Sequence, residues 1–290
     1  MLDEARHFFG KKKVKQLIDY MALYKLNRLH WHLSDEQGWR VEIKAYPKLA
    51  LIGGIGHNTD PFAPAQYYTQ DEVREIVAYA YERGIEILPE FDMPGHATAM
   101  VKAYPEFSGG AKGSRKPNYT LNPGKEELYY FINRILKEVD ALFPFQTIHI
   151  GGDELKDGNS VWNDNADIQA LMKRENLTSF LDVEHYFAHR VADSLFQMNN
   201  RIAAWDELAG LDLPNDKTII YAWRPDKLEM LRKAVEKDYN IVFSPRKPMY
   251  FDYAQDSLQV HGVGWKKFGV NSYRKVYDWD YSTFDVDFSK

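Results

Sequence analysis

The chain has 290 residues, of which 44% are hydrophobic, enough for one large core of the size that (β/α)-barrels commonly build from about 250 residues. Its net charge is −5, which lacks the basic excess of a nucleic-acid-binding surface, and the absence of cysteine excludes disulfides, thiolate metal ligands and cysteine nucleophiles. No run of 18 apolar residues predicts a membrane span, and the first residues lack the basic-then-apolar order of a signal peptide.

Short apolar runs alternate along the chain with segments of helical periodicity. Strands are predicted at 2–6, 29–33, 85–88, 147–150, 201–205, 218–221 and 240–243, and helices at 11–25, 69–84, 124–141, 180–198 and 226–237. Thr69 and Glu72 have the spacing of a capping box, and Gly84 ends the same helix. The alternation indicates parallel strands joined by right-handed crossovers. Seven strands are identified, one fewer than in a closed (β/α)8 barrel.

Polar, aromatic or glycine residues follow nearly every predicted strand. They are Arg6, Asp35, Asp92, Asp153, Glu154, Trp205, Asp206, Glu207, Trp223 and Arg224. In a (β/α)-barrel the carboxyl ends of the strands line one mouth, where the active site lies. A doubly wound sheet would instead use a Gly-rich turn after its first strand, and no G-x-G-x-x-G motif occurs there. The pattern therefore favours the barrel.

The segment 148–154 is the most informative part of the chain. An apolar strand meets Gly151 and Gly152, which permit unusual backbone angles, and then two adjacent carboxylates, Asp153 and Glu154. Neighbouring carboxylates at a strand end point in different directions and can take different roles around one bond. The alternative is an acidic pair in the first turn of a helix.

This segment resembles the H-x-G-G-D-E signature of the family 20 glycoside hydrolases, the β-N-acetylhexosaminidases. Further segments resemble the family's other motifs in the family's order: 2–9, 30–40, 89–96, 204–207, 221–223, 250–252 and 277–279. The resemblance covers the chain from residue 2 to about 281. It implies a single catalytic (β/α)8 domain over residues 1–290, which removes terminal N-acetylhexosamines from the non-reducing ends of β-linked glycans.

The resemblance also implies a retaining, substrate-assisted reaction, in which the acetamido oxygen of the substrate attacks the anomeric carbon and forms an oxazolinium intermediate. Glu154 matches the general acid and base. Asp153 matches the carboxylate that orients the acetamido N–H group. Tyr250 matches the phenol that hydrogen-bonds the attacking carbonyl oxygen.

The remaining matched residues are expected to bind or support the substrate. Arg6 and Asp252 match groups that bind ring hydroxyls. Trp205, Trp223 and Trp279 match walls around the sugar and its neighbour, and Asp35 and His96 match a pair that supports the acid. The alternatives are a salt bridge at the barrel bottom for Arg6 and ordinary core packing for Trp205, Trp223 and His96.

Two other functions fit parts of the sequence. His30 and His32 resemble the metal pair of amidohydrolase barrels, but His149 is predicted inside its strand and the strands ending at Trp205 and Tyr221 offer no histidine. Alternation along the strand points Asp35 away from His32 unless the loop turns first, so both histidines could be packing residues. A non-catalytic carbohydrate-binding relative would not need Asp153 and Glu154. We therefore expect an enzyme without a metal or other cofactor, and no nucleic-acid or membrane partner.

The chain departs from the family at its ends. No segment matches the eighth strand, whose Trp and Glu complete the sugar pocket in the family. The stretch 273–288 is predicted to be a loop around Trp279, because it is acidic and has few β-branched residues. The domain is therefore expected to be truncated at both ends relative to the family, with an open sheet edge.

Overall fold

The computed structural model describes residues 1–110, 118–155, 159–259 and 265–283. The chain divides into two compact units, Met1–Ala204 and Trp205–Lys290. Both consist of parallel strands alternating with helices, as the sequence predicts.

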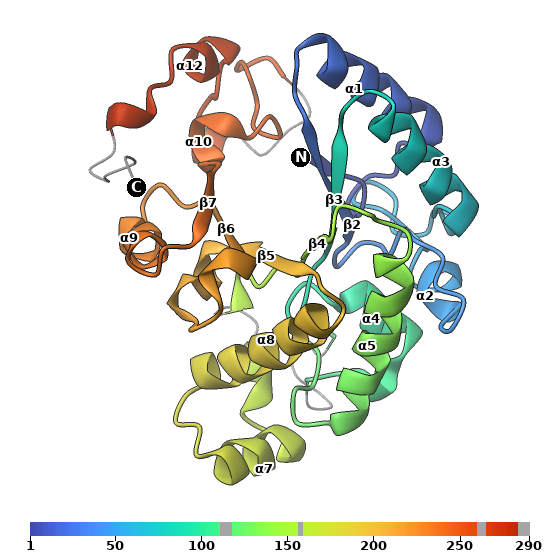
Figure 1. Cartoon of the computed structure of the whole chain (residues 1–290), viewed down its shortest axis with the longest axis vertical. Helices are drawn as coiled ribbons and strands as arrows, with labels where there is room; N and C mark the ends of the chain where they lie inside the picture. Colours follow the sequence, from blue (N-terminus) through green and yellow to red (C-terminus); the bar gives the residue numbers. More distant parts are fainter. Residues whose placement is uncertain (111–117, 156–158, 260–264, 284–290) are drawn as a thin grey trace. The chain divides into compact units, whose positions relative to one another are not determined.

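The first unit contains strands β1 to β5, each paired in parallel with the next along the chain (Figure 1). The strands are β1 (Leu2–Asp3), β2 (Arg28–Ser34), β3 (Glu86–Phe91), β4 (Thr147–His149) and β5 (Arg201–Trp205), whose last residue begins the second unit. The helices are α1 (Lys11–Leu23), α2 (Lys48–Leu51), α3 (Gln70–Tyr81), α4 (Thr98–Ala103), α5 (Glu126–Asp140), α7 (Ala166–Glu175) and α8 (Phe180–Gln197). Two 3₁₀ helices, η1 (Pro105–Phe107) and η2 (Asn159–Trp162), lie between them.

The second unit contains the parallel pair β6 (Thr218–Ala222) and β7 (Asn240–Phe243). Its other elements are η3 (Asp206–Gly210), η4 (Asn215–Lys217), α9 (Leu228–Glu236), α10 (Arg246–Met249), α11 (Trp265–Phe268), α12 (Tyr273–Tyr277) and η5 (Tyr281–Thr283). Ala209, Ile220, Ala234 and Tyr239 form its buried apolar cluster. The Tyr239 hydroxyl donates to the Leu211 carbonyl, so its buried polar end is satisfied.

Helices cover the strands of the first unit because each has one apolar face. The α3 helix begins with the predicted capping box, in which Thr69 accepts from the Glu72 N–H and the Glu72 side chain accepts from the Thr69 N–H. The α1 helix packs against α3, and α5 against α8 (Figure 1). The inward face of α5 carries Leu128, Phe131, Ile132, Ile135, Leu136 and Val139, all buried.

The β2 strand is buried on both faces, as is usual in parallel sheets covered by helices. One face carries Leu29, Trp31 and Leu33, which are at most 1% exposed. The other carries His30, His32 and Ser34, so charged and polar side chains lie inside the unit rather than at its surface. Such groups stay buried only when they are hydrogen-bonded or paired, and their partners belong to the site described below.

The predicted bounds differ from the structure at several elements, and three of these differences concern the site or the C-terminal stretch. The first strand ends at Asp3 instead of residue 6, because the Asp3 carboxylate accepts the Arg6 N–H at 3.0 Å and turns the chain. The β4 strand ends at His149, so this residue closes the strand rather than lying inside it. Within 273–288, the predicted loop contains the short helix α12 before Trp279, and residues 284–288 lie outside the described residues.

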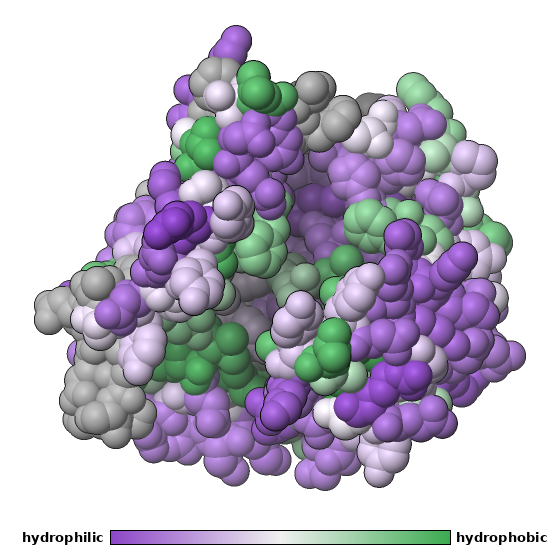
Figure 2. All heavy atoms as spheres, turned by 90° about the horizontal axis from the view of Figure 1, so that it is seen from above, coloured by the Kyte–Doolittle hydropathy of each residue, from purple (hydrophilic) through white to green (hydrophobic). Residues whose placement is uncertain are grey.

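Hydrophilic side chains predominate on the face shown in Figure 2, with smaller hydrophobic patches between them. Among the described helices, none combines the length and the apolar character needed to cross a bilayer.

Candidate active site

The Asp153–Glu154 pair follows β4 on a tight backbone turn. Gly151 and Gly152 have φ angles of +74° and +89°, a region that glycine adopts without steric cost. A Cβ atom on Gly151 would lie 1.7 Å from Asp92 Oδ1, so only glycine fits beside this carboxylate. Gly152 N–H donates to the same oxygen at 3.3 Å. The two glycines therefore bring the pair against the end of β3.

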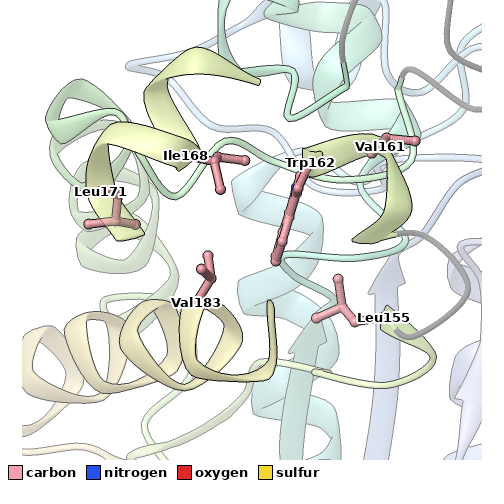
Figure 3. Close-up of a cluster of buried hydrophobic side chains, with 6 residues drawn as sticks. All are labelled: Leu155, Val161, Trp162, Ile168, Leu171 and Val183. Carbon is pink, nitrogen blue, oxygen red and sulfur yellow. The ribbon is translucent and has the colours of Figure 1, made fainter. Parts of the chain in front are cut away.

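Glu154 itself has a φ of +53° and a half-exposed side chain. The residue after it, Leu155, is buried in an apolar cluster with Val161, Trp162, Ile168, Leu171 and Val183 (Figure 3). The Trp162 indole N–H donates to Thr120 Oγ1 at 2.9 Å, which fixes the largest member of the cluster. The Asp153–Glu154 pair thus lies between two anchored points, the glycine turn before it and Leu155 after it.

His96 connects the pair to the inside of the unit. Its Nε2 atom lies 3.5 Å from Glu154 Oε2 and 3.7 Å from Asp153 Oδ2. Its Nδ1 atom lies 2.9 Å from Asp35 Oδ1. The ring is buried and packs at 5.2 Å from that of Tyr119.

Arg6 reaches the same carboxylate from the turn after β1. Its guanidinium lies 2.7 Å from Asp35 Oδ2 and 2.6 Å from Asp3 Oδ2. Asp3 ends β1, and Arg6 and Asp35 lie in the turns after β1 and β2, as expected for polar groups at the carboxyl ends of parallel strands. Arg6 is therefore part of the site and not a salt bridge at the opposite end of the strands.

The charges of the site shift its protonation equilibria in opposite directions. Burial opposes charge on Asp35, but hydrogen bonds from His32 and His96 and the charge of Arg6 hold its pKa well below the usual range. Burial likewise opposes charge on His96, whereas Asp153, Asp92 and Asp35 raise its pKa well above the usual range. His96 in turn lowers the pKa of Glu154. Asp92 is different: burial first, then the negative charge of Asp153, raises its pKa.

Three histidines, two on β2 and one at the end of β4, contact a second buried carboxylate, that of Glu90 on β3. His30 Nε2 and His32 Nδ1 each lie 2.7 Å from Glu90 Oε2, and His149 Nδ1 lies 3.2 Å from Oε1. Two ligands of one tetrahedral zinc ion lie about 3.3 Å apart, because each bond measures roughly 2.0–2.1 Å. The His32 Nδ1 atom hydrogen-bonds the carboxylate at 2.7 Å, a contact shorter than the spacing of two zinc ligands.

The loop after β2 turns at once, so Asp35 lies on the same side as His32. The pairing of β2 with β3 shifts register between His32 and Ser34. As a result, His32 Nε2 lies 3.0 Å from Asp35 Oδ2. The simple alternation that would point Asp35 away from the histidines is broken by this bulge.

In the second unit, three predicted aromatic residues lie together. The ring centroids of Trp205 and Trp223 are 6.4 Å apart at 69°, and the Trp223 and Tyr250 rings stack at 6.5 Å and 19°. Glu207 accepts the Trp223 indole N–H at 3.2 Å and fixes that ring. Asn271, which the sequence did not single out, donates to the Tyr250 carbonyl at 3.1 Å.

The remaining two predicted residues lie elsewhere in this unit. Asp252 is exposed. Trp279 is partly buried, and its ring centroid lies 5.8 Å from that of Phe243 at the end of β7. Both follow β7 in the chain, and their roles remain those predicted from the family motifs.

Comparison with known protein families matches residues 1–289 to "Glycosyl hydrolase family 20, catalytic domain". The chain belongs to this family. It is 36% identical to a beta-hexosaminidase from Vibrio furnissii, over 97% of this chain and 48% of that protein. It is 29% identical to the human beta-hexosaminidase subunit beta, over 92% of this chain and 46% of that protein.

Solved structures of family members share the fold. An exo beta-N-acetylglucosaminidase from Vibrio harveyi, in complex with N-acetylglucosamine, has a TM-score of 0.87 at 33% identity, covering 99% of this chain and 47% of that one. A beta-N-acetylhexosaminidase from Streptomyces coelicolor has a TM-score of 0.79 at 31% identity, covering 98% and 55%. The fold is that of a (β/α)8 barrel with seven strands in the described residues. The chain spans about half the length of these relatives.

Proposed function

We propose that the protein hydrolyses terminal β-linked N-acetylhexosamines at the non-reducing ends of glycans. The observation that carries this proposal is the Asp153–Glu154 pair facing the Nε2 atom of His96, at 3.7 and 3.5 Å, in a chain of glycosyl hydrolase family 20. The relatives named above are hexosaminidases.

In the proposed reaction the substrate's acetamido oxygen attacks the anomeric carbon, so no enzyme nucleophile is required. Glu154 protonates the leaving oxygen and afterwards takes a proton from the attacking water. Its half-exposed side chain suits both steps, since it must meet substrate and water in turn. Asp153 orients the acetamido N–H group and stabilises the positive charge of the oxazolinium ion.

The other predicted residues complete the proposal through their match to the family. Tyr250 hydrogen-bonds the attacking carbonyl oxygen and holds it close to the anomeric carbon. Arg6 contributes a guanidinium for a ring hydroxyl, although its contacts with Asp3 and Asp35 already occupy much of that group. Trp205, Trp223, Asp252 and Trp279 are proposed to contact the sugars.

The proposal is tested by comparing a chromogenic N-acetyl-β-glucosaminide with the corresponding plain β-glucoside. Only the first substrate carries the internal nucleophile, so only it should be cleaved. Glu154→Gln, with unchanged folding by circular dichroism, is the matched inactive control. Binding of N-acetylglucosamine without cleavage of either glycoside would instead favour a non-catalytic carbohydrate-binding protein. Efficient cleavage of the plain β-glucoside would contradict the substrate-assisted mechanism.

A further inference from the structure

A continuous line of ionisable side chains runs from the interior of the first unit to the catalytic pair. It begins at Glu90 on β3, passes through His32 and Asp35, and reaches His96, whose Nε2 atom faces the pair. The successive contacts measure 2.7, 3.0 and 2.9 Å. Glu90, His32, Asp35 and His96 are each at most 4% exposed. Their interactions are therefore poorly screened by water.

The hydrogen-bond geometry fixes the protonation of His32. Each of its ring nitrogens faces a carboxylate, Glu90 on one side and Asp35 on the other. An ionised carboxylate only accepts hydrogen bonds, whereas a neutral imidazole has a single N–H group to donate. A neutral ring would leave a lone pair facing one of the carboxylates. Both contacts are satisfied only when the ring carries both protons.

Asp35 is the carboxylate that depends most on this arrangement. Its Oδ2 atom meets Arg6 and His32, and its Oδ1 atom meets His96 and the Glu36 N–H. These four donors match the four lone-pair sites of an ionised carboxylate. His32 is the only one of the four that reaches Asp35 from within the sheet, so it sets the plane in which the carboxylate lies.

We propose that His32, held by Glu90, is a permanently charged positioning residue for the catalytic pair. It fixes the Asp35 carboxylate, which orients the His96 ring so that its Nε2–H points at Asp153 and Glu154. The role rests on the proposed function, because Glu154 is taken as the general acid. Without the His32 charge, Asp35 would keep Arg6, His96 and the Glu36 N–H as donors but lose its donor on β2. Its carboxylate would then be held less rigidly, and the His96 ring would be aimed less well at Glu154.

The charged neighbours of His32 come from three elements. The nearest are Asp3 at the end of β1, Asp35 after β2, Glu90 on β3 and Asp92 after β3. The groups beyond them are Arg6, His30, His96 and His149. Burial by itself lowers the pKa of His32, but Glu90, Asp3 and the hydrogen bond to Asp35 raise it well above its usual value. The direction agrees with the geometry.

The test compares His32→Gln with His30→Gln. Both histidines lie on β2 and contact Glu90 Oε2 at 2.7 Å, and His32 also contacts Asp35 Oδ2 at 3.0 Å. His30→Gln therefore controls for loss of a buried ring beside Glu90. For both variants, kcat and KM are measured on an N-acetyl-β-glucosaminide with a good leaving group, 4-nitrophenol, and on one with a poor leaving group, the β-linked disaccharide.

For His32→Gln we expect kcat on the disaccharide to fall on the order of 10- to 100-fold, with KM within about threefold, because acid positioning is lost. Cleavage of the 4-nitrophenyl glycoside should fall much less, since its leaving group needs little protonation. The alkaline limb of the kcat profile should move to higher pH, because the His96 ring, which lowers the pKa of Glu154, is held less well against it. His30→Gln should change the ratio between the two substrates by less than about threefold. Equal loss on both substrates, or the same change in both variants, would overturn the proposal.

A second measurement uses the unmutated protein and does not depend on activity. In ¹⁵N spectra of protein labelled at histidine, His32 should show two protonated ring nitrogens throughout pH 5–9, while His30, whose pKa is lowered to about 4, should be neutral. A neutral His32 ring at pH 7 would refute its proposed charge even if His32→Gln fails to fold. If the unmutated protein cleaves neither glycoside, the proposed function fails, and these spectra still decide the charge of His32.

Discussion

Substitution of Gly151 by alanine tests whether the glycine turn holds the proposed catalytic pair, Asp153 and Glu154, in place. Gly151 has a φ of +74°, and an added Cβ would lie 1.7 Å from Asp92 Oδ1 and 2.9 Å from Asp92 Cα. The Asp92 side chain is buried and its backbone N–H donates to Ser34 Oγ at 3.1 Å, so β3 has little freedom to move. The turn after β4 must therefore shift, and Asp153 and Glu154 shift with it.

The expected loss of stability has two contributions. A left-handed backbone costs a non-glycine residue about 1–2 kcal/mol, and forcing an extra methyl group into a packed interior typically costs about 1–3 kcal/mol. Gly151→Ala should therefore lower the free energy of unfolding by about 2–5 kcal/mol. Gly84→Ala is the matched control, because Gly84 has a φ of +68° but no atom within 4 Å of its added Cβ. Gly84→Ala should therefore lose only the stability that the left-handed backbone costs, about 1–2 kcal/mol.

Urea unfolding of both variants separates the two contributions, and kcat/KM on a chromogenic N-acetyl-β-glucosaminide reports the position of the pair. A displacement of about 1 Å at a catalytic group can lower the rate on the order of 100-fold, so Gly151→Ala should be severely impaired and Gly84→Ala nearly unaffected. If the two variants lost equal stability and Gly151→Ala kept its activity, the close approach to Asp92 would not position the catalytic residues.

The remaining predictions concern the proposed catalytic residues, the need for a metal and the buried histidines. Glu154→Gln should abolish cleavage of substrates with poor leaving groups and reduce the first step less for good ones; equal loss for both would argue against its role as the acid. Asp153→Asn and Tyr250→Phe should each lower kcat on the order of 100-fold or more through loss of acetamide positioning, and a stable thiazoline mimic of the intermediate should inhibit well below substrate concentration. Dialysis against EDTA should leave activity unchanged, whereas loss restored by zinc would revive a metal-dependent reaction. The pKa values of His32 and His96 are raised in the folded protein, so above the unfolded value of about 6.5 the folded state keeps protons that the unfolded chain releases. Their contribution to stability is complete below pH 6.5 and should decline by about 1.4 kcal/mol per pH unit for each as the pH rises; urea unfolding of His96→Gln should show a weaker decline than the parent protein.

The order of the seven strands and of five helices could be predicted, because these segments have a clear period or capping signal, whereas α2, α4 and α7 were not predicted. The capping box at Thr69 and the helix at 124–141 depend on local features of the sequence, and both are confirmed. The early end of β1 could not be predicted, since it depends on the Asp3 side chain accepting the Arg6 N–H. The helix α12 has only five residues, too few for a periodic pattern to be recognised.

The residues of the candidate site were predicted from motifs, but their mutual contacts were not. Alternation along β2 correctly places His30 and His32 on one side, yet it points Asp35 to the other side. The register shift after His32 reverses this outcome. A bulge of this kind depends on how β2 pairs with β3. The register between the two strands cannot be recognised from the pattern of residues in either one. Glu90 is buried within β3. Apart from the family motif that contains it, nothing in the sequence marks it as a partner of the histidines.

The candidate site contains strained backbone angles and buried charges, both of which lower the stability of the folded protein. Among described non-glycine residues with positive φ, most flank helices or strands, as Asn176 does at the end of α7. His96 and Glu154 instead hold φ angles of +51° and +53° in the loops after β3 and β4, a conformation that costs such residues roughly 1–3 kcal/mol each. Buried ion pairs such as that of His96 with Asp35 are likewise often no more stable than an apolar replacement. Packing alone explains neither feature, but both follow if the backbone must present a carboxylate of defined protonation to a bound sugar. If Glu154 is the general acid, as proposed, the strained φ angles and the buried charges are two parts of one requirement, because both bring His96 Nε2 to 3.5 Å from the Glu154 carboxylate before the substrate arrives.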